Sequence, residues 1–178
     1  MSGEKRLEKV RGEMGLLERI VSYLPGYRGY KEKELRRETD RLVRMEAVNR
    51  HRAAKEALRR KLTNPALLQR ISGEDMWVLE SLMSRLDRVI QRLDRAVAGY
   101  AGMFDSVRVK EDKLDSALQL DLELIEKADS LKADTEALVK MSPGGEEWRQ
   151  GMNNLMLRVE EIDALIDRRV EIFRGLTG

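Results

Sequence analysis

The chain has 178 residues, of which 37% are charged and 4% are aromatic, with three prolines and no cysteine. A charge-rich, proline-poor composition is typical of long helices and coiled coils. The length suits one domain that buries roughly 70% of the surface of its unfolded chain. We therefore predict an all-α protein, an antiparallel helical bundle of four to five long helices with coiled-coil-like packing.

The composition also excludes several classes of protein. Without cysteine the chain has no disulfides, no thiolate metal sites and no thiol nucleophiles. It contains no apolar run of about 18 residues, the length that a membrane-spanning helix requires. We expect a cytoplasmic protein.

Charge is distributed unevenly along the chain. Residues 1–61 hold 18 Lys and Arg against 10 Asp and Glu, whereas residues 62–178 hold 16 against 22. The two parts, with net charges of +8 and −6, sum to the overall +2. We expect a single domain over 1–178, with a basic helical hairpin at 1–62 and an acidic three-helix core at 63–178.

The first two predicted helices meet at a loop that contains Pro25. Apolar residues from Leu7 to Leu24 recur at spacings of three and four, which predicts a helix over about 4–23 with a narrow apolar seam. Pro25 and Gly26 end this helix. A second helix is expected over about 30–62.

Three further start signals divide the rest of the chain. Asn64 and Pro65 read as an N-cap and first residue of a short helix over 65–71, and Ser72 reads as the N-cap of the third long helix. A fourth helix is expected over about 110–141. Pro143 is expected at the first position of a fifth. Short connectors between the third, fourth and fifth long helices predict antiparallel packing.

The second helix carries a row of cations that we call the basic row. At 100° per residue its members fall within a sector of about 80°, interrupted only by Val48. They are Arg37, Arg41, Arg44, Arg52, Lys55 and Arg59. Such a row suits an acidic protein face, a phosphate backbone or an anionic bilayer. The alternative interpretation is a solvated helix face partly neutralised by neighbouring glutamates.

The loop between the first two helices concentrates tyrosine. Tyr23, Tyr27 and Tyr30 lie there with Arg28, and tyrosine offers both stacking area and a polar tip for binding. We include Tyr27, Arg28 and Tyr30 with the basic row as candidate partner-binding residues. The alternative is that these rings fill the gap between two helices.

Two carboxylates and one histidine complete the candidate residues. Asp121 and Asp163 interrupt apolar arcs of the fourth and fifth long helices, where a buried carboxylate needs a partner. We expect buried polar contacts, such as a shared Arg or Tyr, in preference to a metal. His51 lies beside the basic row, and we expect it to be exposed. We expect no catalytic residues, no cofactor and no metal.

Two stretches carry a resemblance. The first runs from Leu24 to Glu38 (LPGYRGYKEKELRRE), and the second from Gly99 through Phe104 to Asp121. They resemble motifs of a family of small uncharacterised prokaryotic helical proteins, the first with the pattern PGY-x-GYKEKE-x-RRE. The resemblance implies no activity. It implies only that the two stretches lie together in the fold.

These features favour a non-enzymatic adaptor or assembly module that binds an acidic protein partner through the basic row, or that self-associates. One alternative uses the same row: RNA binding, including association with the ribosome. A second is peripheral binding to anionic membrane, in which Lys5, Arg6, Lys9 and Arg11 join the apolar residues of the first helix; few aromatic anchors on that helix argue against strong insertion. No small-molecule substrate is expected.

Overall fold

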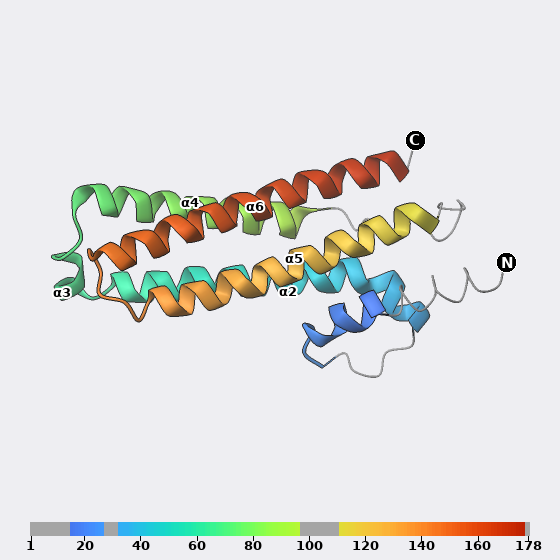
Figure 1. Cartoon of the computed structure of the whole chain (residues 1–178), viewed down its shortest axis with the longest axis horizontal. Helices are drawn as coiled ribbons and strands as arrows, with labels where there is room; N and C mark the ends of the chain where they lie inside the picture. The colour runs from blue at the N-terminus through green and yellow to red at the C-terminus, as the bar shows by residue number, and fades with distance from the viewer. Residues whose placement is uncertain (1–14, 27–31, 97–110, 177–178) are drawn as a thin grey trace.

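The computed structural model describes residues 15–26, 32–96 and 111–176, and within these ranges it contains helices and no strand (Figure 1). The predicted all-α class is confirmed. The helices are residues 15–22, α2 (Glu32–Leu62), α3 (Pro65–Leu68), α4 (Gly73–Arg95), α5 (Glu111–Leu138) and α6 (Glu146–Leu176).

Side-chain caps begin α3 and α4 where the sequence predicted them. The Asn64 side chain accepts a hydrogen bond from the backbone N–H of Ala66 at 3.0 Å. The Ser72 hydroxyl accepts one from the backbone N–H of Asp75 at 3.1 Å. Each cap satisfies a donor that the helix itself leaves unpaired. Helix α3 ends at Leu68, three residues earlier than expected.

The predicted start of α6 is wrong by three residues. Pro143 does not occupy the first helical position, because Gly144 adopts a φ of 81°, which is incompatible with a right-handed helix. The helix begins at Glu146, and the Gly145 carbonyl accepts a hydrogen bond from the Arg149 N–H at 3.1 Å. Glu146 and Glu147 then supply the expected acids of the first turn.

The four long helices occupy the corners of a bundle. Helix α2 contacts α4 and α5, and α6 also contacts both. Arg44 on α2 reaches residue 93 of α4 while Lys55 reaches residue 87, so this pair is antiparallel. The pair of α5 and α6 is antiparallel as well, because Asp121 bonds Arg169 and Asp134 bonds Arg158.

The other two neighbouring pairs are parallel. Ion pairs between α4 and α6 run from Asp75–Arg149 to Arg92–Asp167, and all but Arg92–Asp163 join residues 74 or 75 positions apart. Consecutive helices α4 and α5 therefore take opposite corners, and the expected antiparallel contact between them is not formed.

The N-terminal helix of residues 15–22 packs against α2 and α5. Its Arg19 pairs with Glu126 of α5 at 2.7 Å, and Arg50 of α2 donates to the Tyr23 carbonyl at 2.8 Å. Leu17, Ile20 and Leu24 are buried here, and Ile20 lies outside the predicted seam. Tyr23 packs under the Arg50 guanidinium, 5.7 Å from the ring centre, in a cation–π arrangement.

One continuous core links the N-terminal segment with all four long helices. Its members include Leu17 from the first helix, Val43 from α2, Leu86 from α4, Ile125 from α5 and Ile162 from α6. The core is therefore built by four long helices, and the division at residue 62 separates charge, not folding units.

Candidate interaction surface

Part of the basic row is directed at α4, and its other described members are exposed. Arg44 is only 8% exposed, and its guanidinium donates to the carbonyls of Leu93 at 3.2 Å and Ala96 at 2.5 Å. These carbonyls belong to the end of α4, where backbone acceptors lack partners within the helix and the helix dipole favours a cation. Burial lowers the pKa of Arg44, which the charges of Asp121 and Asp94 offset in part.

Two further members of the row pair with α4. Lys55 donates to the Asp87 carboxylate at 2.5 Å, and Arg52 reaches Asp94 at 3.5 Å. Val48, the one apolar residue in the row, is 3% exposed and belongs to the core. Val48 was therefore the sign, in the sequence alone, that part of the row faces the interior, because the centre of a fully solvated row is expected to be polar.

Pairs of this kind join the basic and acidic parts of the chain. Arg19 and Arg50 contact carboxylates of α5, while Arg52 and Lys55 contact carboxylates of α4. Among the described residues, these four cations of residues 1–61 thus pair with carboxylates of the acidic part.

A narrower group on α2 stays exposed, and we call it the α2 outer face. It consists of Arg41, Met45, Arg52 and Arg59. At 100° per residue these four side chains fall within about 40° of one another, along roughly 27 Å of helix. Met45 is 49% exposed and lies between these cations.

The cations of the α2 outer face are held weakly. Arg41 pairs with Glu38 one turn away at 3.1 Å and touches the Met45 sulfur at 3.8 Å. The Arg52–Asp94 pair is longer and more than half exposed at both ends. Exposed pairs contribute about 0–1 kcal/mol each, so a partner's carboxylate exchanges for them at little cost.

The structure does not describe the side chains of the other candidate partner-binding residues. Tyr27, Arg28 and Tyr30 lie outside the described residues, as does the side chain of Arg37. The second stretch of the family resemblance also lies largely outside them, so the expected proximity of the two stretches stays a prediction.

Asp121 makes the predicted buried polar contact. It is fully buried on α5 and accepts a hydrogen bond from the Arg169 Nε of α6 at 3.1 Å. Burial lowers the pKa of Arg169 to about 10. Arg44 also feels the charge of Asp121. A carboxylate and two arginines from three helices therefore share the interior near the end of α4.

Asp163 is also paired, but where α6 meets α4 and not where it meets α5. Its carboxylate accepts from Arg88 at 2.9 Å and from Arg92, both on α4. Asp121 and Asp163 thus have separate arginine partners instead of sharing one. Within the described ranges, no cluster of His, Asp and Glu is arranged to hold a metal ion.

The expectation that His51 is exposed is wrong. The side chain is fully buried, and its Nδ1 lies 2.7 Å from the Ala47 carbonyl. Burial lowers its pKa, and the hydrogen bond to Ala47 opposes this only in part. Around the axis of α2, His51 lies next to Arg44 on the side of the core. Because α2 directs Arg44 toward α4, it also places His51 in the interior.

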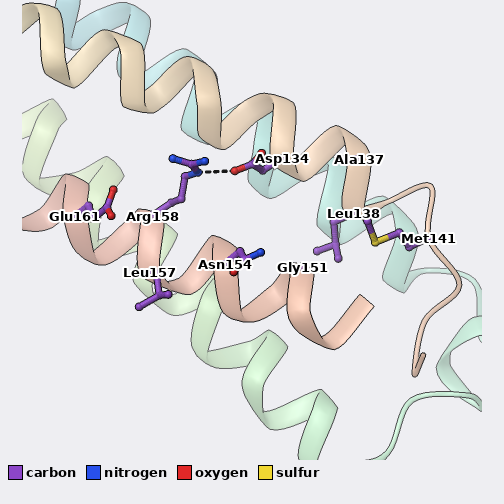
Figure 2. Close-up of a pocket in the computed structure, with 9 residues that line it drawn as sticks. All are labelled: Asp134, Ala137, Leu138, Met141, Gly151, Asn154, Leu157, Arg158 and Glu161. Carbon is purple, nitrogen blue, oxygen red and sulfur yellow. Dashed lines mark hydrogen bonds and ion pairs between the residues drawn. The ribbon is translucent and has the colours of Figure 1, made fainter. Parts of the chain in front are cut away.

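A surface groove of about 460 Å³ lies between α5 and α6 (Figure 2). Its floor is Leu138, and Gly151 allows the close approach, since a Cβ there would lie 2.7 Å from a Leu138 methyl carbon. The Arg158–Asp134 ion pair bridges the two helices at 2.5 Å. Leu157 projects from α6 on the side away from α5.

No described helix combines the length and apolar character needed to cross a bilayer. Comparison of the chain with protein-family models, curated proteins and solved structures gives no match. The surface geometry therefore carries the functional inference.

Proposed function

We propose that this protein is a non-enzymatic helical-bundle adaptor or assembly module that binds an acidic protein partner through the α2 outer face. The observation that carries the proposal is the line of Arg41, Met45, Arg52 and Arg59 on one exposed strip of α2. An exposed methionine supplies an adaptable apolar contact, and flanking arginines supply bidentate recognition of carboxylates.

The strip favours a helical or extended acidic segment over a nucleic-acid backbone. Met45 contributes nothing to phosphate binding, whereas it provides the apolar centre that a protein interface surrounds with polar contacts. Arg44 and Lys55, which a phosphate track would also use, are directed at α4. RNA and anionic membrane are therefore the competing outcomes of the test.

Native co-purification tests the proposal. The full chain carries an affinity tag, and R52Q/R59Q is compared with R19Q/R168Q, a control that removes the same charge from exposed arginines elsewhere. We expect an acidic protein in stoichiometric amount with the wild type and the control, and at least about tenfold less with R52Q/R59Q.

Three results would reject it. One is an unchanged protein partner with R52Q/R59Q, and another is RNA as the main co-purified component, with affinity that falls steeply with salt. The third is co-sedimentation with anionic liposomes that depends on Arg52 and Arg59 while no protein is retained.

A further inference from the structure

Met45 is the most exposed of the methionines that the structure describes. Its side chain is 49% exposed at the centre of the α2 outer face. Met152 is 1% exposed, and the other described methionines are half-buried against the core: Met76, Met83, Met141 and Met156. Hydroperoxides oxidise the thioether of methionine to a sulfoxide, and an exposed sulfur reacts before a buried one. Met45 is therefore the described methionine that a peroxide reaches first.

The Met45 sulfur lies against a cation that a partner would use. The Arg41 guanidinium places one nitrogen 3.8 Å from this sulfur and another 3.1 Å from the Glu38 carboxylate. A thioether is a weak acceptor, so its contact with Arg41 holds the cation only loosely. The sulfur has a second lone pair, and the contact therefore does not block its oxidation.

We propose that Met45 is a site of oxidative modification, where a hydroperoxide converts the thioether to a sulfoxide and thereby weakens the binding of the acidic partner. The inference rests on the proposed function and adds a means of regulating the same strip. In the reaction, a sulfur lone pair forms a bond to the outer oxygen of the hydroperoxide, and the O–O bond breaks. The proton of the transferred oxygen passes to the departing oxygen, which leaves as water when the oxidant is hydrogen peroxide. The sulfur loses two electrons and the peroxide gains them.

The sulfoxide changes the strip in two ways. It converts the apolar centre of the α2 outer face into a polar group, which costs free energy when a partner removes it from water. Its oxygen is also a stronger acceptor than the sulfur, and it forms on an atom that an Arg41 nitrogen already contacts. Arg41 then donates to this oxygen instead of to a carboxylate of the partner. Both changes act against the same complex.

Oxidation at this position leaves the bundle intact. Met45 is not a member of the hydrophobic core, whereas Met152 lies inside it. A polar sulfoxide at Met152 would disrupt core packing. Met45 is thus a position where oxidation alters a surface without unfolding the protein.

Peptide mapping after treatment with hydrogen peroxide tests the site. Trypsin releases residues 45–50 as a peptide in which Met45 is the single methionine, and residues 150–158 carry Met152 and Met156. In the folded protein we expect the sulfoxide in 45–50 before 150–158, with an unchanged circular dichroism spectrum. In guanidinium chloride the two peptides are oxidised at similar rates. Similar rates in the folded protein would overturn the proposal.

Retention of the partner measures the consequence. M45L keeps an apolar side chain without a sulfur, and M45Q places a polar group of similar length at the same position. We expect peroxide treatment to reduce the acidic protein that the tagged wild type retains from a lysate by about tenfold or more, and to leave M45L unaffected. M45Q retains little of it even without peroxide. Methionine sulfoxide reductase supplied with a dithiol restores retention by the oxidised wild type.

Failure of this inference is distinguishable from failure of the proposed function. If the untreated wild type retains no acidic protein, the proposed function is rejected and the role of Met45 with it. If the untreated and the oxidised wild type retain the same amount, only the inference about Met45 is overturned. Loss of the partner by oxidised M45L also overturns it, because another methionine is then responsible.

Discussion

The buried pair of Asp121 and Arg169 offers the sharpest test of the interior. Replacing Asp121 with Asn removes the charge that faces the Arg169 guanidinium while preserving the shape of the side chain. The Asp121 side chain is 0% exposed and that of Arg169 is 6% exposed, so solvent does not compensate for the loss. Removing one partner of a buried ion pair costs about 3–5 kcal/mol.

The expected loss is large for a domain of this size. For its length, each kcal/mol lowers the unfolding temperature by about 2–4 °C, so D121N should unfold about 6–20 °C below the wild type. Urea unfolding followed by circular dichroism at 222 nm measures the free energy directly, and the slope with denaturant should stay unchanged.

A neighbouring ion pair supplies the control. Arg168 and Glu123 join the same two helices at 3.7 Å, but their side chains are 63% and 33% exposed. E123Q should therefore cost less than about 1 kcal/mol. The double variant D121L/R169M should be more stable than D121N, because it removes the Arg169 guanidinium together with its carboxylate. Equal effects of D121N and E123Q would refute the reasoning.

Three other substitutions address separate features. Because burial lowers the pKa of His51, the imidazole of the unfolded chain takes up a proton near pH 6.5, before that of the folded chain does. The free energy of unfolding should therefore fall as the pH drops below about 6.5. Urea titrations of H51L should show a flatter decline. G144A should lower the free energy of unfolding by about 1–3 kcal/mol, because the φ of Gly144 is 81° and a Cβ there would lie 2.4 Å from the Arg70 carbonyl oxygen. G145A, at a residue whose φ is not positive, should lower it less, and thermal melts compare the two variants. R44M should lower the free energy of unfolding by about 1.5–3 kcal/mol, because it removes the charged hydrogen bonds to the Leu93 and Ala96 carbonyls. Amide exchange in the last turn of α4 should become faster. Protection equal to that of the wild type there would contradict a capping role for Arg44.

Several elements of the fold were predictable because their signals are local. The Asn64 and Ser72 caps act within three residues, so the sequence alone identified where α3 and α4 begin. The predicted start of α6 was wrong because Gly144 follows Pro143 with a positive φ, and a glycine in the sequence does not by itself reveal its φ.

The candidate surface was only half predictable. The sequence identified which cations share a sector of α2, but it did not identify what that sector faces. Arg44, Lys55 and Val48 turn toward α4, while Arg41, Arg52 and Arg59 remain exposed.

The sequence by itself determined that this protein is helical, where most helices begin, and which side chains line each face, because helix periodicity and capping act over a few residues. Only the tertiary structure decided that α4 and α6 run parallel, that His51 is buried, and that Arg19, Arg50, Arg52 and Lys55 pair with carboxylates of α4 and α5. The physical reason is that helix α2 has only a weakly apolar face. Its rotation is fixed by the carbonyls and carboxylates of its neighbours, which lie 30 to 80 positions away in sequence.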